Sequence, residues 1–236
     1  MGFPQIGISF GSSKIFKGLP YEFLDKFADG SIHWAWAKYL GEVSETGKYV
    51  IEENGQIRIG ILGTYDGCWD DSHNEGSRLF IGTPAMPCEI TTKLTEATIG
   101  DKTQAGLFIS KAPKGFGGTL YLGICYKKDS AQEKNGICVV QNMWTNKAST
   151  TITQLPMWFR IRLGNTSYES SIIYFDYSLN GVLWTNLWTT PTPRTAWAYW
   201  PLNPAAVGLY TSNDYFTKQA VEGKFDFFRM KSIVKD

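Results

Sequence analysis

The sequence predicts an all-β protein, an antiparallel sandwich of two sheets, and three observations support this. Apolar and polar residues alternate with a period of two along several segments, whereas the 3.6-residue period of a helix is nearly absent. Glycines and prolines interrupt these segments at short intervals, as antiparallel sandwiches require. Aromatic residues make up 15% of the chain, and their large rings suit the space between two sheets.

A length of 236 residues accommodates one large β domain. We assign residues 1–18 to an N-terminal arm and residues 19–236 to the sandwich. Ile6, Ile8 and Phe10 alternate like a strand, but frequent glycines weaken an isolated strand there. The arm is therefore expected to dock on the sandwich edge or to contact a protein partner in a larger assembly.

Three segments show the alternation most clearly, at residues 57–61, 120–126 and 159–163. Isoleucines alternate with Arg58 and Gly60 in the first segment, and large apolar residues alternate with smaller ones in the second. In the third segment, apolar residues alternate with arginines. Alternation of this kind is typical of a strand that buries one face, so each segment is predicted to be a half-buried strand.

Residues 172–185 are predicted to form a β-hairpin. Two apolar-rich arms flank Asn180 and Gly181, a pair that favours a two-residue turn with positive φ at both positions. Counting outward from this turn places Tyr177 opposite Trp184 as an aromatic cross-strand pair. We expect both rings to be structural.

A second hairpin is predicted to join residues 119–127 to residues 136–141 through a polar tip at 129–135. Cys125 and Cys138 would then face each other across it. A disulfide and two reduced, buried thiols both fit this arrangement. Reduced thiols are favoured because the sequence shows no secretion signal.

The charge balance indicates which partners to expect. Lys and Arg number 23 and Asp and Glu number 22, so a net charge of +1 argues against nucleic acid as a partner. No apolar run approaches the roughly 18 residues of a membrane span, so no membrane insertion is expected. Without a recognisable signal, synthesis in a cytoplasm is predicted.

Seven motifs carry a family resemblance through their order along the chain. They are FADG at 27–30 followed by WAW at 34–36, CEITTKL at 88–94, QAGLFIS at 104–110, WFRIRL at 158–163, YSLNGVLW at 177–184, VGLY at 207–210 and FDFF at 225–228. This order resembles the concanavalin A-like lectin/glucanase superfamily, and most closely its non-catalytic modules of the laminin G-like or glycosidase-associated kind. The resemblance covers roughly residues 19–235. It implies two antiparallel sheets in jelly-roll order, with a concave face or rim that meets carbohydrate in many relatives.

The resemblance also implies where catalytic acids would stand. Glucanases of this superfamily carry E-x-D-x-x-E on one strand, whereas Glu89 is followed by Ile-Thr-Thr-Lys-Leu. His33 is interpreted as a packed or rim histidine, and no activated nucleophile accompanies His73. The chain is therefore predicted not to be an enzyme. An acid pair that converges from separate strands is the minor alternative.

The stretch YDGCWDDSHNEG at 65–76 gathers most of the reactive side chains into one predicted loop. Two roles are expected for this loop. The first is ligand recognition at the sandwich rim, by Trp69, Asp70, Asp71, His73 and Asn74. The second is a structural calcium ion held by Asp66, Asp70 and Asp71, although their spacing misses the D-x-D-x-D-G pattern. No other cofactor is expected.

Aromatic residues between two predicted strands form a further candidate site. Trp197, Tyr199 and Trp200 lie in a proline-bounded segment, where their flat faces suit stacking on sugar rings. The alternative is that they cap the core or contact another protein. Trp144 poses the same choice, whereas Trp158 lies in a family motif and is predicted to be core.

The sequence thus predicts a non-catalytic module that recognises carbohydrate or a cell-surface glycan, either alone or as part of a virion. The first alternative is a structural, decoration or adhesion protein of a phage capsid or tail that binds no glycan. The second, minor alternative is a glycoside hydrolase with an unrecognised acid pair.

Overall fold

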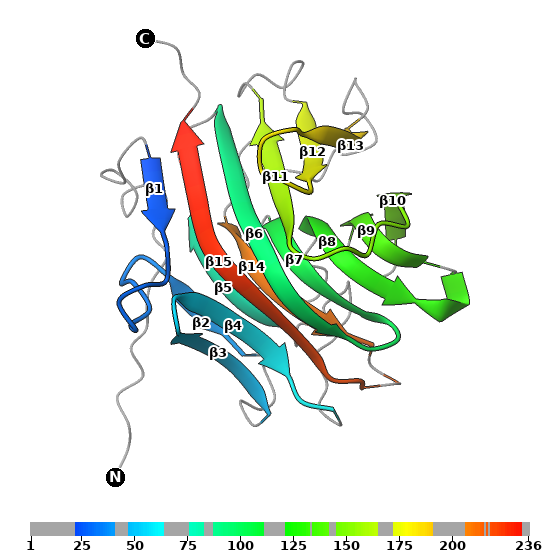
Figure 1. Cartoon of the computed structure of the whole chain (residues 1–236), viewed down its shortest axis with the longest axis horizontal. Helices are drawn as coiled ribbons and strands as arrows, with labels where there is room; N and C mark the ends of the chain where they lie inside the picture. Colours follow the sequence, from blue (N-terminus) through cyan, green and yellow to red (C-terminus); the bar gives the residue numbers. More distant parts are fainter. Residues whose placement is uncertain are drawn as a thin grey trace.

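The structure, a computed structural model, is an antiparallel β-sandwich of two sheets (Figure 1), as predicted. It describes residues 22–40, 47–63, 76–82, 87–110, 121–132, 134–141, 145–164, 172–190, 206–214, 216 and 218–232. Residues 1–21, which include the predicted arm, lie outside these ranges. Among the described residues, no helix is long and apolar enough to cross a membrane.

The first sheet follows the order β13-β12-β11-β6-β15-β4-β3, with β1 also paired to β15. Its strands are β1 (Glu22–Asp25), β3 (Lys48–Glu53), β4 (Gln56–Ile61), β6 (Cys88–Ile99), β11 (Met157–Leu163), β12 (Ile173–Ser178), β13 (Thr185–Thr189) and β15 (Val221–Ser232).

The second sheet follows the order β10-β9-β8-β7-β14-β5-β2. Its strands are β2 (Ala37–Tyr39), β5 (Ser77–Gly82), β7 (Thr103–Ser110), β8 (Tyr121–Asp129), β9 (Lys134–Gln141), β10 (Thr145–Ser149) and β14 (Ala206–Asn213), and a short 3₁₀ turn, η1 (Ser130–Gln132), joins β8 to β9.

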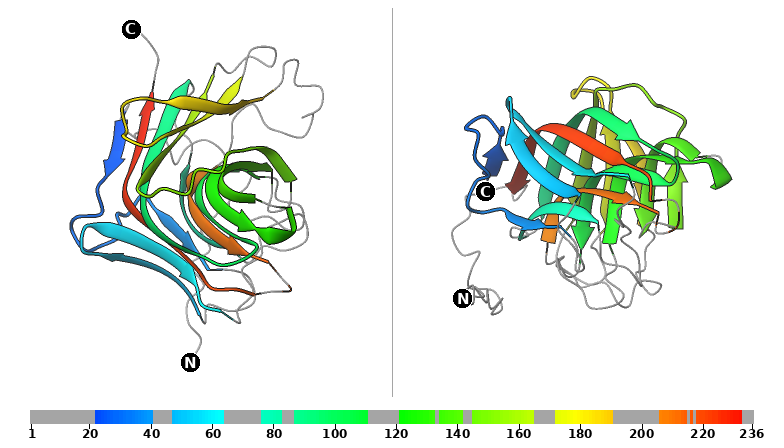
Figure 2. Two further views of the ribbon diagram at one scale, coloured as in Figure 1. Left: turned by 45° about the vertical axis from the view of Figure 1, so that its right-hand side comes forward. Right: turned by 90° about the horizontal axis from the view of Figure 1, so that it is seen from below.

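The last two described strands, β14 and β15, occupy central positions in the two sheets. β15 pairs with β6 on one side and with β4 on the other, and β14 pairs with β7 and β5 in the same manner. Figure 2 shows the two sheets as the layers of the sandwich, with β15 in one and β14 in the other. Pairings between strands distant in sequence therefore hold the centre of each layer.

Side chains alternate across each strand, and the faces that the two sheets turn toward each other form the main core. Ile57, Ile59 and Ile61 on β4 are almost fully buried, as are Phe159, Ile161 and Leu163 on β11. All of these except Ile61 belong to one apolar cluster with inward-facing residues of the second sheet such as Leu107, Ile109, Leu122, Ile124, Val207 and Leu209. The half-buried strands predicted at 57–61 and 159–163 are thereby confirmed.

The hairpin predicted at 172–185 forms with a different turn. Tyr177 pairs with Thr185 rather than with Trp184, and positive φ occurs at Gly181 but not at Asn180. The reason is local hydrogen bonding, because Asn180 Oδ1 accepts the backbone N–H groups of residues 182 and 183. The connection is therefore longer than the predicted two residues.

The second predicted hairpin is confirmed with a shorter tip. β8 and β9 pair from Asp129–Lys134 inward, and Cys125 lies directly opposite Cys138. The two cysteines form no disulfide, and both are buried. Cys125 Sγ donates a hydrogen bond to the backbone oxygen of Cys138 at 3.7 Å. Burial raises the pKa of the Cys125 thiol, so it is held as an unreactive thiol rather than a thiolate.

Trp158 and Trp184, predicted to be structural core, lie instead on the outer face of the first sheet. Each is partly buried and covered by a cation. The Arg160 guanidinium lies 4.2 Å from the centre of the Trp184 ring, and Lys93 Nζ lies 5.3 Å from that of Trp158. The alternation that puts Phe159 inside requires Trp158 to face outward, since successive side chains point to opposite faces.

Asp176 organises this outer face. It is 1% exposed. Its Oδ2 accepts hydrogen bonds from Nε of Arg160 at 2.9 Å and of Arg162 at 2.7 Å, and Asn186 donates to Oδ1 at 2.9 Å. Burial opposes ionisation, but the bonds from Arg162 and Asn186 and both guanidinium charges hold the pKa of Asp176 below its usual range. An ionised, buried carboxylate thus ties β11 to β12.

Candidate functional site

The site residues predicted from sequence all lie outside the described residues. They comprise the rim loop, its calcium ligands and the loop aromatics, namely Asp66, Trp69, Asp70, Asp71, His73, Asn74, Trp144, Trp197, Tyr199 and Trp200. In the described part of the chain, no group of three or more His, Cys, Asp and Glu residues is placed to hold a metal ion.

Two carboxyl groups from separate segments meet at one edge of the first sheet. Asp29 lies in the connection from β1 to β2, and Glu52 lies on β3. Gly30 stands 22 positions before Glu52 in the sequence, and its backbone N–H donates to Glu52 Oε1 at 2.9 Å. Gly30 has φ of 75°, a conformation that glycine adopts without steric cost. This turn brings the Asp29 side chain into hydrogen-bonding contact with Glu52.

The two acids respond differently to this contact. Burial raises the pKa of Glu52, and the hydrogen bond and negative charge of Asp29 raise it further. The pKa of Asp29 is lowered, chiefly by the backbone N–H of Ser31, which donates to Oδ1 at 3.0 Å, and also by the hydrogen bond with Glu52. The opposite shifts mean that Glu52 keeps its proton to a higher pH than Asp29 does.

The two oxygens of Glu52 have different surroundings. Oε1 accepts from Gly30. Oε2 is buried and accepts no hydrogen bond from any described residue. A buried carboxylate oxygen without a donor is costly, whereas a protonated oxygen acts as the donor itself. The surroundings of Oε2 therefore disfavour the ionised form of Glu52, in agreement with its raised pKa.

The connection that carries Asp29 is fixed at both ends. Asp25 Oδ1 accepts from the backbone N–H of Phe27 at 2.8 Å, and Oδ2 accepts from Nε1 of Trp36 at 2.8 Å. Phe27 is 1% exposed and has φ of 51°, which is uncommon for a bulky residue. Trp36 packs edge-on against Phe228 with ring centres 4.7 Å apart. Because such strain persists only where packing enforces it, this segment is held in one conformation.

An aromatic surface stands on the same connection. Trp34 is 84% exposed. Its neighbour His33 has its ring 5.5 Å from that of Phe23, and His33 Nδ1 accepts the backbone N–H of Ala35 at 3.2 Å. His33 is partly buried, which agrees with its interpretation as a packed or rim histidine. The Trp34 indole leaves a flat apolar face in solvent, the kind of surface on which sugar rings stack.

This arrangement offers acid and base chemistry in one place. A neutral carboxylic acid in contact with an ionised carboxylate supplies both a proton donor and a negative charge, the combination that glycosidases use. Groups in hydrogen-bonding contact lie closer together than the roughly 5–5.5 Å of retaining enzymes, so this pair would have to separate to admit a sugar between its members.

Sequence reasoning did not assign this pair, although it left open an acid pair from separate strands. Asp29 belongs to the FADG motif, but its partner on β3 follows no fixed spacing. The available signal was the Asp-Gly-Ser turn, because Gly after Asp often marks a backbone with positive φ. Only the pairing of β3 at the sheet edge shows which carboxylate faces that turn.

Solved structures share this fold. No protein-family model matches the chain, and neither does any curated protein. The GH43 protein BlXynB from Bacillus licheniformis is 18% identical over 89% of this chain and 39% of its own, with a TM-score of 0.64. Xylan beta-1,4-xylosidase from Bacillus halodurans C-125 is 19% identical over 92% of this chain and 40% of its own, with a TM-score of 0.59.

A third structure matches along its whole length. It is described under endo-acting O-glycanases that human gut microbiota express to initiate mucin breakdown, and it is 11% identical over 90% of this chain and 99% of its own, with a TM-score of 0.58. The chain spans about 40% of the BlXynB chain and of the xylosidase chain. At these identities the similarity shows the fold, a β-sandwich that carbohydrate-active enzymes also use.

These comparisons correct the functional prediction. The chain was predicted to be a non-catalytic recognition module or a structural virion protein, and not an enzyme. That prediction is wrong because the matching sandwiches belong to chains described as xylosidases and glycanases. The error came from treating the absent E-x-D-x-x-E strand as the absence of catalytic acids. An acid pair can also be assembled from a turn and an edge strand.

Proposed function

We propose that this protein acts in the hydrolysis of glycosidic bonds, with Glu52 as the general acid and Asp29 as the carboxylate that faces the anomeric carbon. The observation that carries the proposal is the contact between two carboxyl groups whose pKa values are displaced in opposite directions. Pairs of this kind divide acid and base roles between chemically similar groups.

The proposed reaction gives each acid one role. Glu52 donates its proton to the glycosidic oxygen, and the bond from that oxygen to the anomeric carbon breaks with its electron pair on the leaving oxygen. The Asp29 carboxylate stabilises the positive charge on the sugar and bonds to its anomeric carbon. Water then attacks this carbon and gives a proton to the ionised Glu52, while the bond from the carbon to Asp29 breaks with its electron pair on the carboxylate. Glu52 is then protonated and Asp29 ionised, as at the start.

The exposed Trp34 would hold the sugar beside the pair. Its connection is fixed by Asp25, so the indole and Asp29 keep a constant relation to each other. A platform on a rigid element positions substrate better than one on a flexible loop. Carbohydrate is thus proposed as substrate rather than as a passive ligand.

The names of the similar structures guide the choice of substrate. One is a xylan beta-1,4-xylosidase, and another is described with O-glycanases that break down mucin. We therefore propose β-linked xylosides and mucin-type O-glycans as the first substrates to test. The chain spans about 40% of the xylosidase chain, so action on the substrate of that enzyme is part of this proposal.

We further propose that the sandwich has the jelly-roll order of concanavalin A-like proteins. The support is the position of the last two strands, because β14 lies between β7 and β5 while β15 lies between β6 and β4. Strands from the end of the chain thus complete the centre of both sheets.

Hydrolysis of aryl glycosides tests the function. Aryl β-xylosides, aryl α-arabinofuranosides and an aryl O-glycan disaccharide are incubated with the wild type, with Glu52→Gln and with Glu53→Gln. Loss of a general acid costs typically 10²–10⁴-fold in rate, so Glu52→Gln is expected to lose at least ~100-fold. Glu53 is the matched control, since it follows on the same strand but pairs with Arg58. Its variant is expected to stay within about twofold of the wild type.

Two results would contradict the proposal. One is that no glycoside in the panel is hydrolysed by the wild type. The other is that Glu52→Gln and Glu53→Gln hydrolyse equally well, which would separate any activity from the acid pair.

A further inference from the structure

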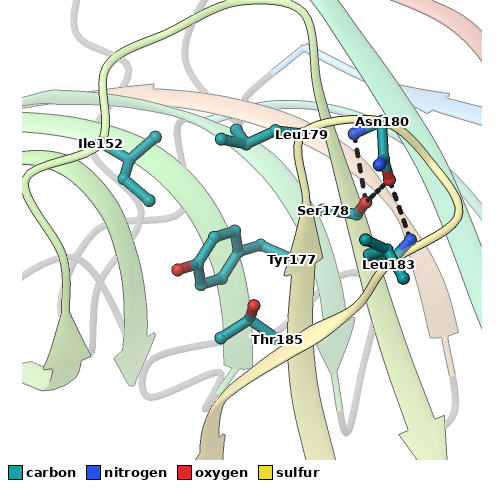
Figure 3. A pocket seen from close by; sticks show the side chains of 7 residues that line it. All are labelled: Ile152, Tyr177, Ser178, Leu179, Asn180, Leu183 and Thr185. Carbon is teal, nitrogen blue, oxygen red and sulfur yellow. Dashed lines mark hydrogen bonds between the residues drawn. The ribbon is translucent and has the colours of Figure 1, made fainter.

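A cavity of about 230 Å³ lies beside the β12–β13 hairpin (Figure 3). None of its lining residues belongs to the connection that carries Asp29 or to β3, so the cavity is distinct from the acid pair. It is lined by Ile152, Tyr177, Ser178, Leu179, Asn180, Leu183 and Thr185.

Internal hydrogen bonds hold the hairpin wall of the cavity in place. Ser178 Oγ accepts the backbone N–H of Gly181 at 2.9 Å and donates to Asn180 Oδ1 at 3.1 Å. Asn180 Oδ1 also accepts the backbone N–H of Leu183 at 2.8 Å. Gly181 in turn packs on Trp158, since an added Cβ would lie 3.0 Å from its Nε1. A cavity with walls fixed in this way is formed before a ligand arrives, which lowers the cost of binding.

Three polar groups around the cavity have no partner in the described part of the chain. They are the Tyr177 hydroxyl, the Thr185 hydroxyl and the Asn180 side-chain NH₂. Figure 3 shows the Tyr177 ring and Thr185 on neighbouring strands, with Asn180 at the turn above them. A ligand could therefore donate to or accept from each hydroxyl and accept from the amide. All three residues lie on the β12–β13 hairpin, so the pairing of these two strands sets the spacing between their side chains.

The rest of the lining is apolar. Ile152, Leu179, Leu183 and the ring of Tyr177 form the walls in Figure 3. No Asp, Glu, Lys, Arg or His contributes to the lining, so the cavity favours a neutral ligand. A purely apolar ligand would bury the hydroxyls and the amide without partners, which is costly. The ligand that fits is neutral, with hydroxyl groups on one side and C–H groups on another.

We infer that this cavity is a binding site for a single sugar ring. Sites for drug-sized molecules measure roughly 300–1,000 Å³, so a cavity of about 230 Å³ admits one small ring. A pyranose combines a C–H face, which can lie on the Tyr177 ring, with equatorial hydroxyls that reach Thr185 and Asn180. Leu179, Leu183 and Thr185 are exposed, so the cavity is open to solvent and the rest of a glycan can extend from it.

The choice of a saccharide as ligand rests on the proposed function, whereas the case for a small neutral ligand rests on the cavity alone. The site would hold one unit of a glycan while a more distant linkage is cleaved. Binding there is expected to be independent of Glu52.

Binding is measured by protein NMR titration with methyl β-D-xylopyranoside and methyl β-D-glucopyranoside, in wild type and in Glu52→Gln, in which hydrolysis is suppressed. Shifts are expected at the β12–β13 hairpin, with equal affinity in both proteins. Tyr177→Phe and Thr185→Val each remove one hydroxyl with little change of shape and are expected to weaken binding ~3–10-fold. Val182→Ala is the matched control, because Val182 is on the same hairpin, is 76% exposed and does not line the cavity. It is expected to leave the affinity unchanged within about twofold.

The outcomes separate this inference from the proposed function. Hairpin shifts that depend on Tyr177 and Thr185 support the inference even if no glycoside is hydrolysed. The inference is overturned if neither methyl glycoside shifts the hairpin, or if Tyr177→Phe, Thr185→Val and Val182→Ala all bind like wild type. Either of these results would stand against it even if hydrolysis is observed.

Discussion

The backbone N–H of Gly30 donates to Oε1 of Glu52 at 2.9 Å, and this bond positions the acid pair. It joins a turn of the β1–β2 connection to the edge strand β3. It occupies Oε1 of Glu52, whereas Oε2 is buried without a hydrogen-bond partner among the described residues. The bond therefore fixes how the Glu52 carboxyl group is oriented beside the turn that carries Asp29.

Gly30→Ala is expected to disturb this relation through the backbone alone. Gly30 has φ of 75° and an added Cβ would meet nothing within 4 Å, so the cost is conformational, about 1–2 kcal/mol. Gly55 is a matched control, with φ of 73° and the same open surroundings in the β3–β4 turn. Both variants should lose similar free energy of unfolding in urea, but only Gly30→Ala should lose glycosidase activity. Equal activity of the two variants would show that the Gly30 bond does not position the acids.

Glu52→Gln is expected to change how stability depends on pH. The folded pKa of Glu52 lies above its ordinary value of 4.5, because of burial and then of Asp29. Its stabilising contribution is thus present below about pH 4.5 and is lost as pH rises through the folded pKa. Glutamine cannot ionise, so the variant should gain thermal stability relative to wild type at pH 7 and not at pH 4. Melting temperatures at the two pH values test this, and an equal difference at both would exclude a raised pKa.

Asp176→Asn is expected to destabilise the protein by roughly 2–3 kcal/mol. It would leave Arg160 and Arg162 without their shared buried carboxylate, and breaking one side of such a pair is costly. Because the Asp176 pKa is lowered, the wild-type advantage is present above about pH 3.8 and is lost as pH falls through the folded pKa. Asp226→Asn is the control, since Asp226 and its partner Lys93 are partly exposed and such pairs contribute ~0–1 kcal/mol. Urea unfolding distinguishes them, and equal losses would contradict the role of Asp176.

Trp34→Ala is expected to raise KM for glycosides by roughly 2–10-fold with little change in kcat, because a stacking surface is lost while the acids remain. Stability should be unaffected, since Trp34 is 84% exposed. Phe216 is equally exposed and belongs to a different connection, so Phe216→Ala serves as control. Steady-state kinetics check this. A fall in kcat with unchanged KM would assign Trp34 a different role.

The layers and most strands could be predicted because alternation reports burial directly. Ile57, Ile59 and Ile61 lie inside because a shift of the strand register by one residue would turn all three to the outer face. Turn geometry was harder to predict from the sequence. Asn54–Gly55 forms a two-residue connection with φ of 54° and 73°, whereas the same dipeptide at Asn180–Gly181 does not, because the Asn180 side chain accepts backbone N–H groups. A dipeptide signal cannot report hydrogen bonds from its own side chains.

The acid pair could not be predicted for a different reason. Asp29 and Glu52 are far apart in the sequence. No sequence motif around either residue indicates that the other is its partner. The pKa of Glu52 depends on burial at the edge of β3, a property of the assembled sandwich. By contrast, His33 was interpreted as a packed or rim histidine, and it is partly buried. Two of its contacts, with Trp34 and Ala35, are with residues adjacent to it in the sequence.

The pH dependence of kcat/KM for an aryl glycoside tests the assignment of the acids most directly. The account predicts a rate that rises as Asp29 ionises, below its usual value of 3.8, and falls as Glu52 ionises above its usual value of 4.5. The falling limb should disappear in Glu52→Gln, with a residual rate that no longer depends on pH in that range. A falling limb that persists in Glu52→Gln would contradict the assignment of Glu52 as the proton donor.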